Sequence, residues 1–167
     1  LTALLRLLDI VESEAVPTAA VECREQPRLL VNPAFVARHA ETPEKLLMLV
    51  MHELHHVLLG HTSFFGTVTP VQNFVFDAVI NGLICRMFPE RRYTAFLSDY
   101  YSSGRFPECL LRPPPQWPDA AVIAPGITSF EGPARTAIAE LHRALYSDGG
   151  ATYKEVFDIL PRHLDQS

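Results

Sequence analysis

The sequence has few cysteines, little basic charge and no long apolar run. Its three cysteines, Cys23, Cys85 and Cys109, lie far apart and form no CxxC pair, which argues against a disulfide framework and against a cysteine-only zinc site. Because 14 basic residues face 19 acidic ones, the net charge is -5, and we expect no nucleic acid partner. No apolar stretch approaches the roughly 20 residues that span a bilayer, so we expect no membrane partner. The sparse cysteines favour a reducing compartment, the cytoplasm.

Length and composition fit one globular domain. The chain has 167 residues, of which 48% are hydrophobic and 20% are charged, so it can bury one core. We therefore expect a single domain over residues 1–167. Because the chain begins with Leu1 rather than Met, excision of this domain from a longer chain is a further expectation.

The N-terminal part of the sequence predicts one helix and a small sheet. Leucines at helical spacing predict a helix over residues 2–14. Apolar residues alternate with charged ones around Val21 and Cys23, and Arg28–Val31 is a short apolar run between prolines. These two segments predict short strands that could form a hairpin.

The remainder predicts a mostly helical α+β fold. Helix-start residues such as Thr42-Pro43 and Thr69-Pro70 mark two apolar helices, the first of which ends near Gly60. We expect most of residues 90–125 to form an ordered surface excursion. The expected helices are residues 43–59, 71–87, 132–146 and 152–160, with a further helix at 93–101 and no helix at 112–118.

The first of the two apolar helices carries an HExxH motif, formed by His52, Glu53 and His56. Residues four apart lie on the same face of a helix, so both imidazoles can bind one metal ion from the same side. Neutral imidazole is a good zinc ligand, and the adjacent glutamate can reach a water molecule on the metal. The surrounding residues are apolar, and a buried set of ionisable groups is costly without a partner. The motif therefore predicts a zinc-dependent hydrolase.

A catalytic zinc ion needs a third protein ligand and one open position. Asn73, Asp77 and Asn81 stand four apart in the second apolar helix and form one polar stripe. If this stripe faces the histidines, Asp77 is the third ligand, and the zinc site lies between the two central helices. Asn81 or Asn73 would then hold a ligand by a hydrogen bond.

Two other histidines are alternatives. His61 follows Gly60, so a turn of the chain could return it to the metal as another ligand. His55 projects from another side of the helix than His52 and His56. We expect His55 to support a ligand or the fold.

Two segments together resemble a known family. They are the HExxHxxxGH run over Met51–His61 and the later run Phe76-Asp-Ala-Val-Ile-Asn81. This arrangement resembles a bacterial metallopeptidase domain that is often followed by a von Willebrand A-like domain. The likeness covers residues 28–88, and it extends to the broader gluzincin group of zincins, where a Glu stands in place of Asp77.

The resemblance implies a zincin-like fold and a metallopeptidase activity. It implies that His52, His56 and Asp77 bind Zn²⁺ and that Glu53 is the general base. The substrate would be a peptide or protein, and a partner domain of the A type or an ATPase could act with the chain. In such a mechanism a further electrophile stabilises the oxyanion. The sequence offers four unranked candidates, Tyr93, Tyr100, Tyr101 and Arg105.

Two alternatives to an enzyme stay open. If His61 closes the site as a fourth ligand, the zinc is structural and the chain is a catalytically inactive zinc-binding scaffold or interaction domain. If the motif is accidental, the chain is a metal-free helical interaction domain. Glu53→Gln and His56→Ala are the substitutions that separate these hypotheses.

Overall fold

The computed structural model describes residues 9–22, 28–60 and 68–164, and these fall into two compact units that divide between residues 67 and 68. In the described residues, the first unit holds a small sheet and two helices, and the second is helical. This composition confirms the predicted α+β class, mostly helical with a small sheet.

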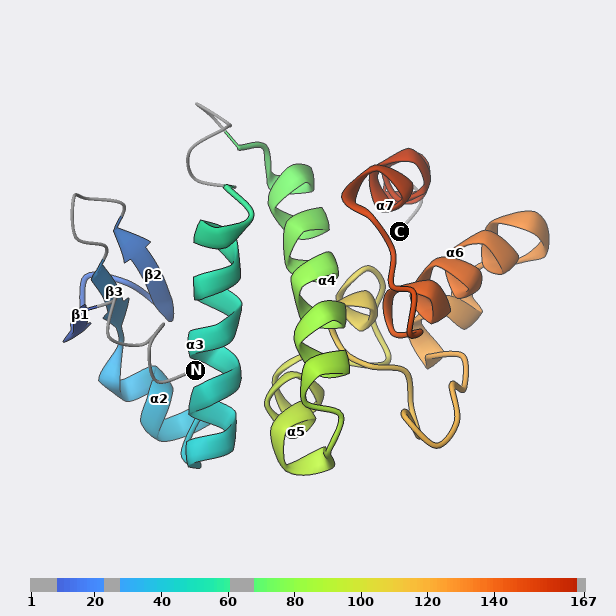
Figure 1. The fold of residues 1–167 in the computed structure, drawn as a ribbon. Coiled ribbons are helices and arrows are strands. Elements are labelled where there is room, and N and C mark those ends of the chain that lie inside the picture. The colour runs from blue at the N-terminus through green and yellow to red at the C-terminus, as the bar shows by residue number, and fades with distance from the viewer. Residues whose placement is uncertain (1–8, 23–27, 61–67, 165–167) are drawn as a thin grey trace. The chain divides into compact units, whose positions relative to one another are not determined.

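The sheet of the first unit has three strands: β1 (Asp9–Glu12), β2 (Ala19–Glu22) and β3 (Arg28–Val31), in the order β1-β3-β2. β2 pairs with β3 antiparallel, which confirms the expected pair of strands, whereas β1 pairs with β3 parallel. Figure 1 shows α3 (Pro43–Leu58) beside this sheet, where it contacts β2.

The predicted helix over residues 2–14 is wrong where the structure describes it. Asp9–Glu12 is strand β1, and residues 1–8 lie outside the described residues. Ile10 and Val11 are adjacent β-branched residues, which favour extended backbone. Pairing with β3, far along the chain, satisfies the backbone hydrogen-bonding groups of this segment. This pairing outweighs the helix that the spacing of the leucines predicted.

The two helices of the first unit begin at side-chain caps. The Asn32 side chain accepts hydrogen bonds from the backbone of Ala34 and Phe35 and starts α2 (Pro33–His39), a helix the sequence analysis missed. Thr42 accepts from the Lys45 amide and starts α3 as predicted. α3 ends at Leu58, and Gly60 follows with φ 70°, the left-handed conformation that glycine adopts most readily.

The second unit is built around α4 (Pro70–Met87), which contacts η1, α5, α6 and α7. These elements are α5 (Arg91–Tyr100), η1 (Glu108–Leu111), η2 (Pro125–Ser129), α6 (Gly132–Leu145), α7 (Tyr153–Ile159) and α8 (Pro161–Leu164). The helices predicted from residues 71, 93, 132 and 152 are confirmed, as is the absence of a helix at 112–118. Among the described residues, no helix combines the length and apolarity needed to cross a bilayer.

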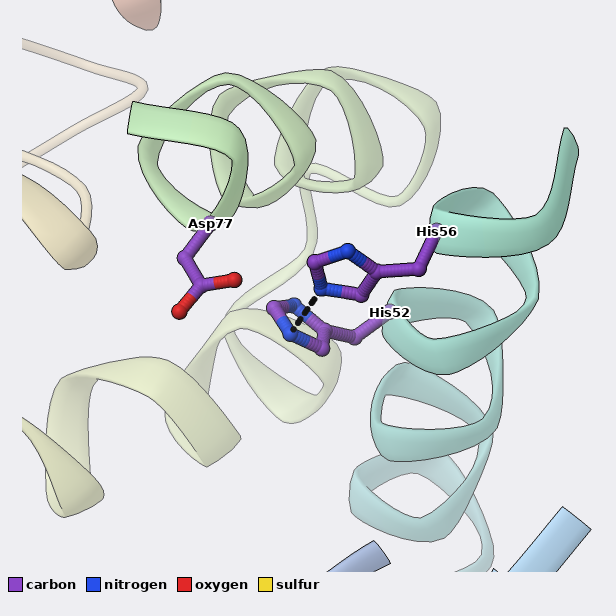
Figure 2. Close-up of side chains that lie close together, drawn as sticks. All are labelled: His52, His56 and Asp77. Carbon is purple, nitrogen blue, oxygen red and sulfur yellow. Dashed lines mark hydrogen bonds between the residues drawn. The ribbon is translucent and has the colours of Figure 1, made fainter. Parts of the chain in front are cut away.

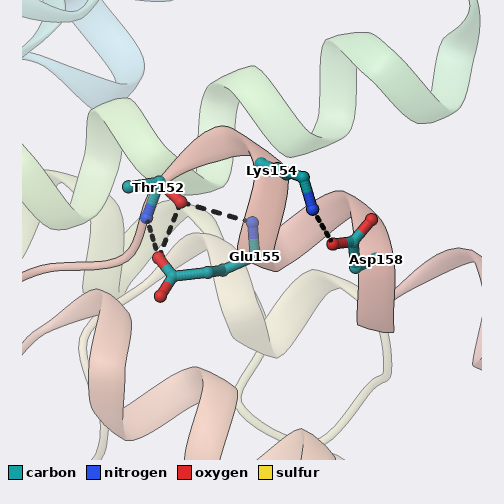
Figure 3. Close-up of polar contacts among 4 residues, drawn as sticks. All are labelled: Thr152, Lys154, Glu155 and Asp158. Atoms are coloured by element: carbon teal, nitrogen blue, oxygen red, sulfur yellow. Dashed lines mark hydrogen bonds and ion pairs between the residues drawn. The ribbon is translucent and has the colours of Figure 1, made fainter.

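Capping boxes define the starts of α4 and α7. At α7 the Thr152 hydroxyl accepts from the Glu155 amide, while the Glu155 carboxylate accepts from the Thr152 backbone (Figure 3). Lys154 and Asp158 add an ion pair of 2.7 Å one turn apart on the same helix. Each capping box satisfies backbone donors that the first helical turn leaves without an intrahelical partner.

The surface excursion expected for most of residues 90–125 is found in part: residues 118–123 are exposed, whereas the stretch around η1 is buried. Cys109, Leu110, Leu111 and Ala124 are buried in the core. Two 3-10 turns, η1 and η2, satisfy part of the local backbone by hydrogen bonding, so this irregular segment can lie inside the unit.

α4 and α6 approach closely at Gly82. A Cβ atom at this position would collide with the carbonyl oxygen of Leu145 in the last turn of α6. The Arg86 guanidinium donates to the same carbonyl. The absence of a side chain at Gly82 therefore permits the contact between the two helices.

Candidate metal centre

The structure brings the imidazoles of His52 and His56 together on α3. Their Nε2 atoms are 3.2 Å apart, and the ring planes meet at 72° with centroids separated by 4.8 Å (Figure 2). Both side chains are half-buried. Met48, Met51, Leu54 and His55 on the same helix are buried, and α3 contacts β2, so the helix that carries the pair is held by packing.

The geometry of this pair fits a zinc ion. Two nitrogens that bind one tetrahedral zinc at about 2.0–2.1 Å lie about 3.3 Å from each other. The observed separation between His52 Nε2 and His56 Nε2 is 3.2 Å. A neutral imidazole that carries its proton on Nδ1 leaves the lone pair of Nε2 available to a metal. Both imidazoles could therefore serve one ion without movement of α3.

Glu53 follows His52 directly on α3 and is half-buried. His56 comes three residues later, so Glu53 projects from a neighbouring strip of the same helix surface. The three residues of the motif thus lie on one rigid element, as the spacing predicted.

His55 is placed apart from the pair. It is buried, and its Nδ1 lies 2.6 Å from the carbonyl oxygen of Met51, one turn earlier in α3. A carbonyl can only accept, so Nδ1 carries the proton and donates. His55 therefore bonds to the helix backbone. The alternative ligand His61 lies outside the described residues.

The polar stripe predicted on α4 runs from solvent to core. Asn73 is exposed, Asp77 is half-buried and Asn81 is fully buried. The Asn73 amide donates to Asp77 Oδ2 across 3.3 Å. The carboxylate of Asp77 extends from α4 (Figure 2). Because Asp77 belongs to the second unit, its place in a ligand set with the histidines is part of the proposal made below.

Asn81 bonds to a distant part of the second unit. Its amide donates to the carbonyl oxygen of Leu111 across 2.9 Å. The carbonyls on either side are bonded in the same way: Tyr146 donates its hydroxyl to Leu110, and His142 Nε2 donates to Arg112. Three successive carbonyls at the end of η1 thus accept hydrogen bonds from side chains of α4 and of the C-terminal end of α6.

Burial sets the ionisation of two members of this cluster. Burial lowers the pKa of His142 to about 4, although its bond to the Arg112 carbonyl acts in the opposite direction. Burial also raises the pKa of Tyr146 well above its usual value. Both side chains are therefore neutral near pH 7. Neither residue stands out in the sequence, because their partners lie 30 and 36 positions away.

The four candidates for oxyanion stabilisation have packing or ionic partners inside the second unit. Tyr93 packs on Phe88, and Tyr100 packs against Tyr101. Arg105 pairs with Glu108. These contacts assign none of the four to the oxyanion role.

Comparison with protein-family models, with curated protein sequences and with solved structures found no match.

Proposed function

We propose that the chain is a zinc-dependent metallopeptidase in which His52, His56 and Asp77 hold the ion and Glu53 is the general base. The observation that carries this proposal is the separation of 3.2 Å between the Nε2 atoms of an HExxH motif on a rigid helix. Two imidazole nitrogens and one carboxylate oxygen are the kinds of ligand that a catalytic zinc ion takes. With three protein ligands, such a site keeps a position open for water or substrate, as catalytic zinc sites do.

In the proposed mechanism the ion acts as a Lewis acid and Glu53 transfers protons. Zinc, when bound, would supply Lewis-acid chemistry that polarises a peptide carbonyl and lowers the pKa of water, so that the water can lose a proton near neutral pH and act as the nucleophile. Glu53 accepts the proton from that water and then passes it to the nitrogen of the leaving amine. His52 and His56 hold their positions because α3 contacts β2 and is held by packing. The substrate in this proposal is a peptide or a protein.

We also propose the cytoplasm as the compartment. Cys85 and Cys109 are free and buried. Burial raises the pKa of both thiols, to about 12 for Cys109, so they are protonated and unreactive at neutral pH. Free thiols persist in reducing compartments, which supports this proposal. A partner domain of the A type or an ATPase, which the family resemblance implies, would act in the same compartment.

The test of the activity is Glu53→Gln, compared with the wild type on a peptide library. The amide cannot accept a proton, so we expect a loss of hydrolysis of at least about 100-fold with zinc content unchanged. Glu44→Gln is a matched control, because Glu44 lies in the first turn of the same helix. It should cleave like the wild type. Equal cleavage by Glu53→Gln and the wild type would contradict the role of Glu53. Zinc binding without cleavage by the wild type would favour a scaffold.

A further inference from the structure

Asp77 has a hydrogen-bond donor at its side on the same helix. Asn73 Nδ2 lies 3.3 Å from Asp77 Oδ2, and the two residues are four positions apart on α4. At this spacing side chains are neighbours on the helix surface. We propose that Asn73 is the positioning residue for the metal ligand Asp77, an inference that rests on the proposed function.

Asn73 contributes little to the fold by itself. It is exposed in the second turn of α4, and asparagine has a lower helix propensity than alanine. The start of α4 is already capped by Thr69 and Gln72, whose side chains form the capping box. The helix therefore does not depend on Asn73 for its first turn, and the amide is directed to the carboxylate of Asp77.

Asn81 is the other candidate that the spacing offers, because it also lies four residues from Asp77. Its side chain is fully buried, and its amide donates to the Leu111 carbonyl. That bond satisfies a carbonyl of the core. The structure thus separates the two asparagines: Asn73 bonds to the carboxylate, whereas Asn81 bonds to the backbone of the 110–112 segment.

The bond has a specific consequence for the carboxylate. A donor on Oδ2 favours one rotamer of Asp77 and one orientation of its two oxygens. Without Asn73, zinc binding must also order the Asp77 side chain, which costs conformational entropy, so the affinity for zinc falls. Loss of such a supporting bond typically lowers metal affinity by about 10- to 100-fold.

The experiment measures zinc affinity of the full chain by competition with a chromophoric chelator. We expect Asn73→Ala to weaken zinc binding by about tenfold or more. The free energy of unfolding of Asn73→Ala, measured in urea without metal, should stay within about 0.5 kcal/mol of the wild-type value. Asn73→Gln keeps an amide that can reach one turn along a helix, so it should restore most of the affinity. Met87→Ala, an exposed truncation in the last turn of α4, is the control and should bind like the wild type.

The outcomes separate this inference from the function on which it rests. Equal zinc affinity of Asn73→Ala and the wild type would overturn the role of Asn73 and leave the zinc site standing. Weaker binding that tracks an equal loss of stability in both Asn73 variants would also overturn it, because Asn73 would then act through the fold. A wild-type chain that binds no zinc would contradict the proposed function itself.

Discussion

His52 Nε2 and His56 Nε2 lie 3.2 Å apart on α3, a helix whose neighbouring residues such as Val50 and Leu54 are buried and which contacts β2. The pair is therefore held by packing before any ion binds. Preorganised ligands lose little conformational entropy on binding, which favours a specific site over a chance contact of surface histidines.

The buried amide of Asn81 should be needed for stability. In Asn81→Leu an apolar side chain of similar size replaces the amide, so the Leu111 carbonyl loses its donor inside the core. We expect the free energy of unfolding to fall by about 1–3 kcal/mol, measured by urea denaturation. The same substitution at the exposed Asn73 is the control and should cost less than about 0.5 kcal/mol. Equal stability of the two variants would show that the Asn81 bond contributes nothing.

The close approach of α4 and α6 predicts a severe effect of one methyl group. In Gly82→Ala the new Cβ meets the backbone oxygen of Leu145, which cannot turn away as a side chain could. We expect a loss of about 1–3 kcal/mol in the free energy of unfolding. Gly149→Ala is the matched control, because no atom lies within 4 Å of its added Cβ. Its stability should be unchanged or slightly higher. If Gly82→Ala unfolds like the wild type, the helices are farther apart than described.

His142 should make the second unit sensitive to acid. Burial lowers its pKa to about 4 in the folded state, below the value of about 6.5 expected for an unfolded chain. Between these values the unfolded state binds more protons. The free energy of unfolding therefore falls as the pH drops from about 6.5 to about 4, and the contribution is complete above pH 6.5. The full loss is on the order of 3 kcal/mol.

Two measurements check the acid effect. Urea unfolding at pH 7 and pH 4.5 should show a smaller pH dependence for His142→Phe than for the wild type, whatever the variant's stability at pH 7. NMR of the wild type should show the His142 imidazole neutral at pH 5. An imidazole that titrates near pH 6.5 in the folded protein would refute this prediction.

Local sequence signals predicted much of the fold. The starts of α3 and α4 follow from Thr-Pro pairs, and the cap residues Thr42 and Thr69 accept the expected backbone bonds. Strand β1 could not be found in this way, because it pairs with β3, far along the chain. The burial of residues such as Cys109 and Ile127 depends on the same kind of distant contact.

In the candidate site, too, some features follow from local sequence and others depend on distant contacts. The positions of His52 and His56 follow from helical spacing alone, as does the bond between Asn73 and Asp77. The partner of Asn81 lies 30 residues away, in a segment that carries no regular pattern. The sequence therefore left the roles of the two asparagines open, and only the three-dimensional structure distinguishes them.

The most direct test of the zinc site is the metal content of natively purified chain by elemental analysis, with His56→Ala and Asp77→Ala beside the wild type. His39→Ala, which removes a histidine from α2, serves as the control. The account predicts close to one zinc per chain in the wild type and control, and little in His56→Ala or Asp77→Ala. A wild-type chain that contains no zinc and takes up none when it is supplied would contradict the account.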